Sequence, residues 1–275
     1  MRRILLTGAA GMVGTVLADL VPREGEVWRL SDMRPIERPD SEAFEVVMGD
    51  LSDPDFAMAL CTDVDAIIHM AAVAREKDWD ELIGPNLVGS INLWQAAVAN
   101  RVDRIIYGSS NHAQGMYPVG MTVRTGDGYR PDSRYGLTKM FGEGLARLHA
   151  DKNGVKAFVI RIGSFLPRPT SERHLRMWIS HRDMGALVRL GLEADYHCET
   201  VFGISANGRA CYDNSRAHAL GYRPQDNAEA YADEIAREAV DPANPVEVLQ
   251  GGHACGRDFT GSLARLLEDI LPERS

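Results

Sequence analysis

Residues 3–14 read RILLTGAAGMVG, a mostly apolar run followed by glycines at every third position. The run from Arg3 to Thr7 predicts a short buried strand, and the apolar spacing from Val13 to Leu20 predicts a helix. Glycines between a strand and a helix let the backbone turn sharply and approach a phosphate, while the helix N-terminus offers free N–H groups. This order is typical of dinucleotide sites. The residues expected to hold the pyrophosphate are Gly8, Gly11, Met12, Val13 and Gly14.

Short apolar runs alternate with segments of helical spacing over the first 165 residues. Most of these runs are continuously apolar, which is typical of parallel strands buried on both faces. The expected strands cover 3–7, 27–30, 44–47, 66–69, 104–107 and 157–162, and the expected helices cover 13–20, 54–60, 82–99 and 135–150. This order predicts an α/β protein with a doubly wound parallel sheet, a Rossmann fold.

Asp32 ends the second expected strand, eighteen residues beyond Gly14. A carboxylate at this place accepts both ribose hydroxyls of an adenosine and repels a 2′-phosphate, which favours NAD over NADP. Arg34 leaves NADP open, because an arginine can accommodate that phosphate. The other expected cofactor contacts are Asp50, Leu51, Met70, Ala71, Ala72, Asn86, Tyr135, Lys139 and Ile162.

The alternation of strands and helices breaks after residue 163. Two prolines, Pro167 and Pro169, predict an irregular loop that continues through 170–177. Further expected features are a helix over 184–192, a strand near 200–204 that rejoins the sheet, a loop at 224–227, a helix over 228–239 and a mobile or partner-dependent tail beyond Asp241. Because no linker divides the chain, we expect one domain over 1–275. Within it, 1–165 form mainly the NAD-binding core, and 166–275 form a small C-terminal substrate-binding elaboration with an oligomer-forming or tail region.

Composition excludes several classes of protein. Lys+Arg 30 against Asp+Glu 39 gives a net charge of −9, which argues against a nucleic-acid partner, since such proteins neutralise phosphates with basic side chains. No apolar run approaches the roughly 18 residues of a membrane span, and the first residues have no signal-peptide pattern. The 4 cysteines lie far apart without a CxxC, which argues against a zinc site. We therefore expect a cytoplasmic, soluble protein with no metal and no membrane partner.

A catalytic pair is expected at the start of the helix over 135–150. Tyr135 and Lys139 form a YxxxK, and the i to i+4 spacing places both side chains on one helix face. An ammonium about 4 Å from the phenol, at an effective dielectric constant of about 20, lowers the tyrosine pKa by up to about 3 units. A phenolate near neutral pH could remove a hydroxyl proton. Ser110, at the carboxyl end of the fifth strand, is expected to hold the substrate oxygen beside it.

These motifs together resemble the extended short-chain dehydrogenase/reductase superfamily. The resemblance rests on TGAAGMVG (7–14), Asp32, SSNH (109–112) and YGLTK (135–139). Within the superfamily the chain is similar to the uronate dehydrogenase family, through SSNH and through RIGS (161–164), WISHRD (178–183), GISAN (203–207), YDNS (212–215) and PQDNAE (224–229).

The resemblance implies NAD-dependent oxidation of a hexuronic acid, galacturonate or glucuronate, at C1 to an aldarolactone. It implies that Tyr135 is the base, that Lys139 tunes its pKa and binds the cofactor ribose, and that Ser110 pairs with the hydroxyl. The residues implied to hold the sugar are Asn111, His112, Ser164 and Arg173. A guanidinium such as that of Arg173 suits a carboxylate bidentately. The helices over 82–99 and 135–150 resemble those that pair across dimers in this superfamily, which implies a homo-oligomer.

Two departures from the family pattern leave the identity of the sugar open. Ala74 stands where the family has a substrate-contacting serine, and Cys211-Tyr212 stand where it tends to have paired tryptophans. One alternative is a related dehydrogenase of a sugar phosphate such as glucose 6-phosphate, which could use the arginines at 168, 173 and 176. Another is an NAD-sensing regulator without enzymatic activity. Such regulators usually lose the catalytic tyrosine or lysine, and both are present in this chain.

Overall fold

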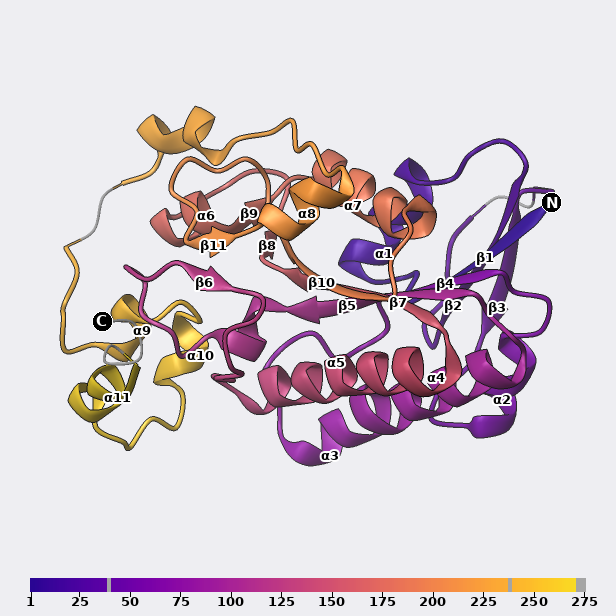
Figure 1. The fold of residues 1–275 in the computed structure, drawn as a ribbon, viewed down its shortest axis with the longest axis horizontal. Coiled ribbons are helices and arrows are strands. Elements are labelled where there is room, and N and C mark those ends of the chain that lie inside the picture. Colours follow the sequence, from indigo (N-terminus) through magenta and orange to yellow (C-terminus); the bar gives the residue numbers. More distant parts are fainter. Residues whose placement is uncertain (39–40, 237–238, 271–275) are drawn as a thin grey trace.

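A seven-stranded parallel sheet forms the centre of the molecule (Figure 1). The computed structural model describes residues 1–38, 41–236 and 239–270. The strand order is β10-β7-β5-β4-β1-β2-β3. Their bounds are β1 (Arg2–Thr7), β2 (Glu26–Asp32), β3 (Phe44–Met48), β4 (Ala66–His69), β5 (Arg104–Ser110), β7 (Lys156–Ile162) and β10 (Cys198–Gly203). The doubly wound parallel sheet is confirmed, and so is the strand near 200–204, which pairs with β7.

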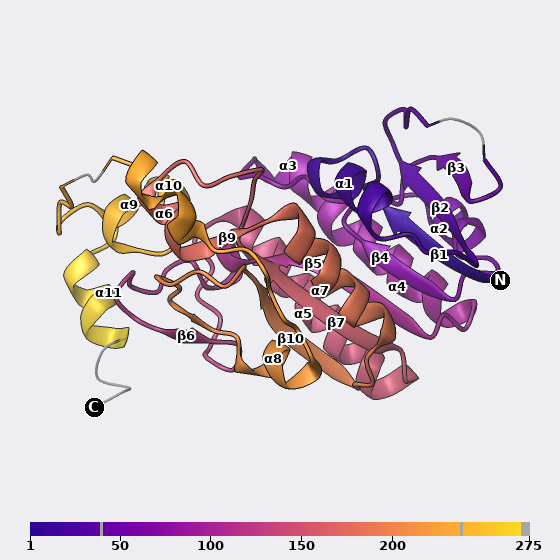
Figure 2. The same ribbon diagram turned by 90° about the horizontal axis from the view of Figure 1, so that it is seen from above.

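Helices cover both faces of this sheet (Figure 2). On one face lie α1 (Met12–Leu20), α7 (His181–Glu193) and α8 (Ser215–Leu220), which pack on Ile4 and Leu6. On the other lie α2 (Pro54–Leu60), α4 (Gly89–Ala99) and α5 (Arg134–Asn153), which pack on Leu5. Because alternate residues of β1 enter opposite cores, the strand is continuously apolar from Ile4 to Leu6. Among the described residues, no helix is long and apolar enough to cross a membrane.

The chain reverses its strand order between β1 and β4, so that the carboxyl ends of these neighbours open a crevice. This arrangement brings the first glycine turn next to the residues that follow β4. A Cβ added at Gly8 would lie 2.6 Å from the backbone nitrogen of Ala71. The ligand crevice of the fold is therefore the place where the glycine motif lies.

The expected continuous helix over 82–99 is wrong at its start. The structure has α3 (Trp79–Leu82), then a π-helical turn η1 (Ile83–Val88), and only then α4. Pro85 lies inside η1 and lacks the N–H that an α-helical ladder needs, so the turn widens there. The wide turn directs Asn86 into the interior, where its side chain is bonded to the backbone of Val73.

The region after 163 is more regular than its prolines predict. The expected loop over 170–177 is wrong, because α6 (Glu172–Met177) forms there with the Ser171 hydroxyl as its N-terminal cap. Two short parallel strand pairs flank it, β8 (Ser164–Phe165) with β9 (Trp178–Ile179) and β6 (Val123–Arg124) with β11 (Tyr212–Asp213). The helix over 184–192 is confirmed within α7.

The expected helix over 228–239 is shorter and of another type. A 3-10 helix, η3 (Ala228–Glu234), begins at an Asn227 cap, and residues 237–238 lie outside the described residues. Ala228 packs with Leu175 and Trp178 in a small core of its own. Tyr231, Ala232 and Ile235 pack against the same small core, which attaches this segment to α6.

The expected mobile tail is wrong for the described residues beyond Asp241. The segment folds into α9 (Pro245–Val248), α10 (His253–Gly256) and α11 (Leu263–Ile270) at the end of the molecule opposite the amino terminus (Figure 1). Gln250 and Gly251 donate backbone hydrogen bonds to the carbonyls of Tyr117 (2.9 Å) and Gly115 (2.8 Å). These bonds attach the segment beside the 3-10 turn η2 (Asn111–Gln114). The C-terminal segment therefore lies near the carboxyl end of β5.

Candidate active site

The glycine loop is shaped so that only glycine fits at its ends. Gly8 has a φ of +73°, and a Cβ at Gly14 would collide with the Gly8 carbonyl oxygen. No side chain caps the N-terminus of α1, whose cap residue is Gly11. The first amides of α1 therefore remain available to an anion, beside the Met12 and Val13 that begin the helix. This loop fits the pyrophosphate of a dinucleotide.

Asp32 lies beside this loop, as predicted. Its carboxylate accepts hydrogen bonds from the backbone of Ala10 (3.1 Å) and of Arg34 (3.0 Å). The Arg34 guanidinium turns back toward it at 3.4 Å and donates to the Ala10 carbonyl (2.7 Å). The two side chains that could read an adenosine ribose are thus placed together. Asp50 is less specific, since its carboxylate closes a local turn at Ser52.

A chain of buried hydrogen bonds connects the cofactor crevice to the catalytic helix. Its members are Thr7, His69, Ser90, Asn86 and Thr138. Asn86 occupies the middle, donating to the Thr138 hydroxyl (3.0 Å), which in turn donates to the carbonyl of Tyr135 (2.8 Å). Burial, assisted by the charge of Lys139, lowers the pKa of His69 to about 3, so this imidazole stays neutral. Of these residues, only Asn86 was predicted at the site.

Tyr135, Lys139 and Ser110 come together at the carboxyl end of β5. The Ser110 hydroxyl hydrogen-bonds the phenol of Tyr135. The Lys139 ammonium lies 5.8 Å from the centre of the tyrosine ring and donates to the Gly108 carbonyl (2.8 Å). The geometry is that of a hydroxyl pair next to a buried ammonium, which can bind and deprotonate an alcohol.

The expected pKa of Tyr135 near neutrality is not found. Burial raises the pKa of Tyr135 to about 12, and the hydrogen bond from Ser110 opposes this only in part. Burial also lowers the pKa of Lys139 to about 8. The ammonium stands over the ring and bonds a carbonyl rather than the phenol oxygen. Its field therefore does not outweigh the loss of solvent around the tyrosine.

A buried ion pair lies beneath Lys139, and the sequence analysis did not find it. The carboxylate of Glu143, one turn beyond Lys139 on α5, pairs with Arg161 of β7 at 2.8 Å, and both side chains are almost fully buried. Ser109 and Tyr129 also donate to this carboxylate, at 2.6 and 3.2 Å. The sequence did hold a signal for Glu143. Tyr135, Lys139 and Glu143 are spaced four residues apart, which places them along one side of the helix.

The residues expected to hold the sugar meet around Arg173 of α6. With its amide oriented to suit its neighbours, Asn111 accepts from Arg173 (3.3 Å) and donates to the Ile162 carbonyl (3.1 Å). Ser164 lies 3.5 Å from the guanidinium, and the Gln250 carbonyl accepts from its Nε (3.1 Å). Burial lowers the pKa of Arg173, and no carboxylate among the described residues lies within ion-pair distance of it. Asp132 is the carboxylate whose charge acts on Arg173, without an ion-pair contact, and a largely buried cation in this position is a candidate for an anion ligand.

His112 is fixed by a carboxylate that the sequence analysis missed. Its Nδ1 lies 2.7 Å from the Asp132 carboxylate, which is fully buried. The imidazole stands edge-on to the Tyr135 ring, with 5.8 Å between ring centres. Gly115 and Gly251 pack against Asp132 so closely that a Cβ on either would collide with it. No local sequence pattern predicts the contact of Asp132 with Gly251, because Gly251 belongs to the C-terminal segment.

Comparison with known proteins agrees with this geometry. Residues 4–187 match the NAD dependent epimerase/dehydratase family. A uronate dehydrogenase of Agrobacterium fabrum is 39% identical, over 92% of this chain and 96% of that one. An NAD-dependent glucose-6-phosphate dehydrogenase of Haloferax volcanii is 37% identical, over 83% of this chain and 95% of that one.

Solved structures show the same relation. The crystal structure of a variant uronate dehydrogenase from Agrobacterium tumefaciens in complex with NAD superposes with a TM-score of 0.88 at 36% identity, covering 93% of this chain and 97% of that one. The chain therefore belongs to the NAD dependent epimerase/dehydratase family, in the group of the uronate dehydrogenases, and is an NAD-dependent enzyme.

Proposed function

We propose that the protein oxidises a hexuronic acid, galacturonate or glucuronate, at C1 to an aldarolactone. The observation that carries this proposal is Arg173, a buried guanidinium with no carboxylate partner among the described residues, joined through Asn111 to the Ser110–Tyr135 pair. A sugar carboxylate would neutralise this cation while the other end of the sugar reaches the phenol. The names of the related uronate dehydrogenases support the same substrate class.

Each catalytic residue has a distinct part in this reaction. NAD, when bound, supplies the acceptor for the hydride of C1. Tyr135 takes the proton of the C1 hydroxyl as its phenolate, and Ser110 holds that hydroxyl in line with it. Lys139, with a pKa of about 8, keeps most of its charge at neutral pH and stabilises the phenolate. Since burial raises the pKa of Tyr135 to about 12, we expect the rate to increase with pH above neutrality.

The sugar is held by residues whose orientation is already set. Because Asp132 holds Nδ1 of His112, the ring donates there and leaves Nε2 as an acceptor for a sugar hydroxyl. Asn111 and Ser164 offer further polar groups beside Arg173. We assign the cofactor to the glycine loop, Asp32, Asp50, Leu51, Met70, Ala71, Ala72, Asn86 and Ile162.

The test is the appearance of NADH at 340 nm. Purified protein receives NAD or NADP with galacturonate, glucuronate, mannuronate, glucose 6-phosphate or glucose. We expect a signal with uronates and NAD. A signal with glucose 6-phosphate alone would favour the sugar-phosphate alternative, and equal rates with glucose would show that Arg173 does not select the substrate. NAD binding without turnover on any sugar would favour the regulator.

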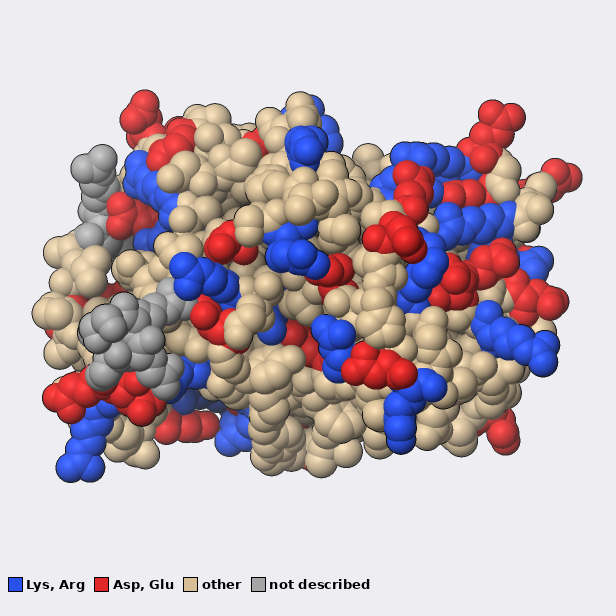
Figure 3. All heavy atoms as spheres, viewed as in Figure 1, with Lys and Arg blue, Asp and Glu red and all other residues tan. Residues whose placement is uncertain are grey.

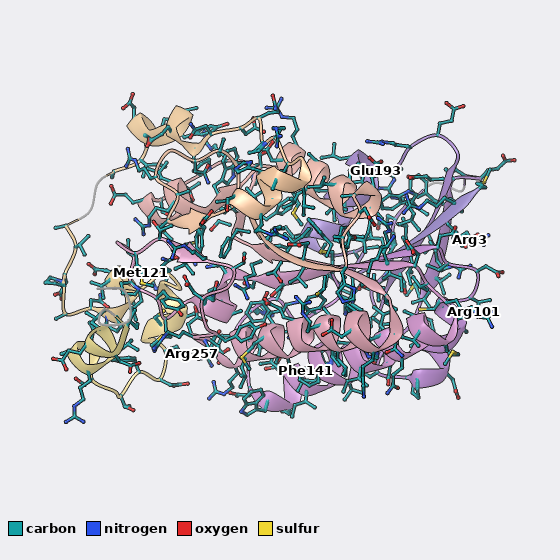
Figure 4. The ribbon with its side chains drawn as sticks, in the orientation of Figure 1. Arg3, Arg101, Met121, Phe141, Glu193 and Arg257 are labelled. Atoms are coloured by element: carbon teal, nitrogen blue, oxygen red, sulfur yellow. The ribbon has the colours of Figure 1, made fainter. Side chains whose placement is uncertain are left out.

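We further propose that each chain forms a single domain and that the chains assemble into a homo-oligomer. We also propose that the protein acts in the cytoplasm. Exposed apolar side chains gather on the outer side of α5 and its neighbours, namely Ile83, Val88, Leu137, Phe141 and Leu148. Figure 4 labels Phe141 there, and Figure 3 shows a mostly uncharged surface over these helices. Light scattering coupled to gel filtration gives the mass in solution, and a mass of about 30.3 kDa would contradict the oligomer.

A further inference from the structure

A second arginine, Arg176, stands beside Arg173 and pairs with no carboxylate in the part of the chain that the structure describes. Arg176 lies three residues further along α6, so both side chains leave the same side of the helix. The Nε of Arg176 is fully buried and has no hydrogen-bond partner. Among the described residues, no carboxylate pairs with Arg176 and no aromatic ring stacks on it. Burial is the main cause that lowers the pKa of Arg173 and raises that of Cys211; the charge of Arg176 adds to the first shift and opposes the second, so Arg176 lies close to both side chains.

Other buried arginines of this chain show how unusual this is. Arg161 is paired with Glu143, and Arg189 is paired with Glu26. Arg104 donates to the carbonyls that end α7. Burying a charged group without a partner costs free energy, and two adjacent like charges add to that cost. Arg173 and Arg176 are only partly exposed and lie together without a carboxylate in ion-pair contact, an arrangement that an anion would stabilise.

The groups around Arg176 indicate the kind of anion. Arg173 already donates to Gln250, Ser164 and Asn111, so a single carboxylate leaves Arg176 unpaired. The buried Tyr212 hydroxyl lies beside Asn111 and makes no hydrogen bond of normal geometry within the described residues. Two guanidinium groups and a hydroxyl suit a group with three terminal oxygens and about two negative charges, as in a phosphate monoester.

We propose that Arg173, Arg176 and Tyr212 form a subsite for a dianionic terminal group, the phosphate monoester of an aldose. The active site then binds a hexose 6-phosphate as well as a hexuronate. This inference rests on the proposed function, because it places the terminal group of the sugar at Arg173 and the reducing end at Tyr135. Arg168 does not belong to the subsite, since it is largely exposed and pairs with Glu234.

The test compares Arg176→Met with Arg168→Met as the matched control. Glucose 6-phosphate is offered as a substrate, and as an inhibitor of hexuronate oxidation. Inorganic phosphate is offered separately as an inhibitor. We expect Arg176→Met to weaken binding of glucose 6-phosphate by at least about tenfold. We expect the KM for the hexuronate to change less than about threefold, and Arg168→Met to change neither constant.

A measurement without ligand separates binding from a structural role. Removing an unpaired cation beside Arg173 should leave the melting temperature unchanged or raise it. A structural arginine would give a lower melting temperature, and that result would contradict the proposal. If Arg176→Met does not fold, Arg176→Gln retains a polar side chain of similar length and is measured in the same assays.

Each remaining outcome decides the matter. If the wild type oxidises the hexuronate but glucose 6-phosphate neither reacts nor competes, the subsite is wrong and the proposed function stands. An equal loss for hexuronate and phosphate ester in Arg176→Met would assign Arg176 to the carboxylate and also overturn the proposal. If neutral aldoses alone are oxidised, the proposed function fails. In that case the subsite is still supported if glucose 6-phosphate inhibits the wild type and no longer inhibits Arg176→Met. Inhibition by inorganic phosphate alone, unchanged in the variant, would overturn it.

Discussion

The two ends of the site differ in how their buried polar groups are satisfied. In the cofactor half, the chain from Thr7 to Thr138 leaves none of its members without a partner, and Glu143 receives three donors. Around Arg173, three buried atoms make no hydrogen bond of normal geometry within the described residues, namely Arg176 Nε, Tyr212 Oη and Gln250 Oε1. Of the described residues, only Trp94 breaks this division.

This difference indicates that the cofactor half holds a fixed geometry, whereas the substrate end is suited to binding a ligand. A fully bonded buried network holds one geometry, which a catalytic tyrosine and a dinucleotide require. A site with unpaired buried donors has a free-energy cost that a ligand can remove. The comparison therefore predicts that changes in the cofactor half affect turnover and folding, whereas changes at the substrate end affect which sugar binds.

The largest expected effect concerns Tyr135→Phe. Loss of the proton acceptor should reduce kcat by about 10² to 10⁴, because general base catalysis contributes about this factor. The affinity for NAD, measured by calorimetry, should remain, since the glycine loop and Asp32 are untouched. Tyr231→Phe is the control, because this tyrosine packs on Trp178 and lies outside the site. Turnover near that of the wild type in Tyr135→Phe would exclude this mechanism.

Glu143→Gln tests the scaffold role of the cofactor half. It leaves Arg161 buried and without its carboxylate, and breaking such a pair costs about 3–5 kcal/mol of unfolding free energy. Denaturant unfolding measures this loss. Glu229→Gln is the matched control, since its pair with Arg209 is partly exposed and is worth ~0–1 kcal/mol. Equal losses in the two variants would show that the buried network does not stabilise the fold.

The same division explains what could be predicted from the sequence. The glycine loop, the alternating strands and helices and the Tyr135–Lys139 pair depend on local spacing, and the structure contains all of them. The π-turn around Asn86 and the Glu143–Arg161 pair were missed. Pro85 within an apolar helical pattern was a signal for the first. The Glu143–Arg161 pair joins α5 to β7, and nothing in the sequence around Arg161 predicts its partner.

At the substrate end, local signals were misleading or absent. Pro167 and Pro169 concealed α6, although Ser171 followed by an acidic residue is a helix-start signal. The contact of Gln250 with Arg173 spans 77 positions, and that of Asp132 with Gly251 spans 119. Such contacts depend on tertiary packing, which periodicity does not report. The segment beyond Asp241 was therefore expected to be a mobile or partner-dependent tail, whereas its Gln250 carbonyl accepts a hydrogen bond from Arg173.

Arg173→Met tests the selectivity of the substrate end. It removes the cation that we propose faces the sugar carboxylate, so the KM for a uronate should increase by about 30-fold or more. The KM for a neutral aldose such as glucose should change little, and the affinity for NAD should not change. The ratio of the two KM changes is the measured quantity. Equal changes for charged and neutral sugars would mean that Arg173 supports the fold and does not recognise the carboxylate.

Gly252→Ala is the smallest and sharpest test, because it alters the position of Arg173 without removing it. Gly252 has a φ of +62°, and an added Cβ would lie 3.0 Å from Arg173 Nε. The strain should cost about 1 kcal/mol of unfolding free energy. The displaced guanidinium should also raise the uronate KM by about threefold to tenfold, with kcat nearly unchanged.

The control for this last variant is Gly120→Ala, where an added Cβ would meet no atom within 4 Å. It should change neither stability nor KM by a measurable amount. If Gly252→Ala loses stability but keeps the uronate KM, the C-terminal segment only supports the fold. If the KM rises for uronates and not for glucose, the segment orients the arginine that reads the carboxylate. In that case a region more than 70 residues away from Arg173 in sequence helps to set substrate selectivity.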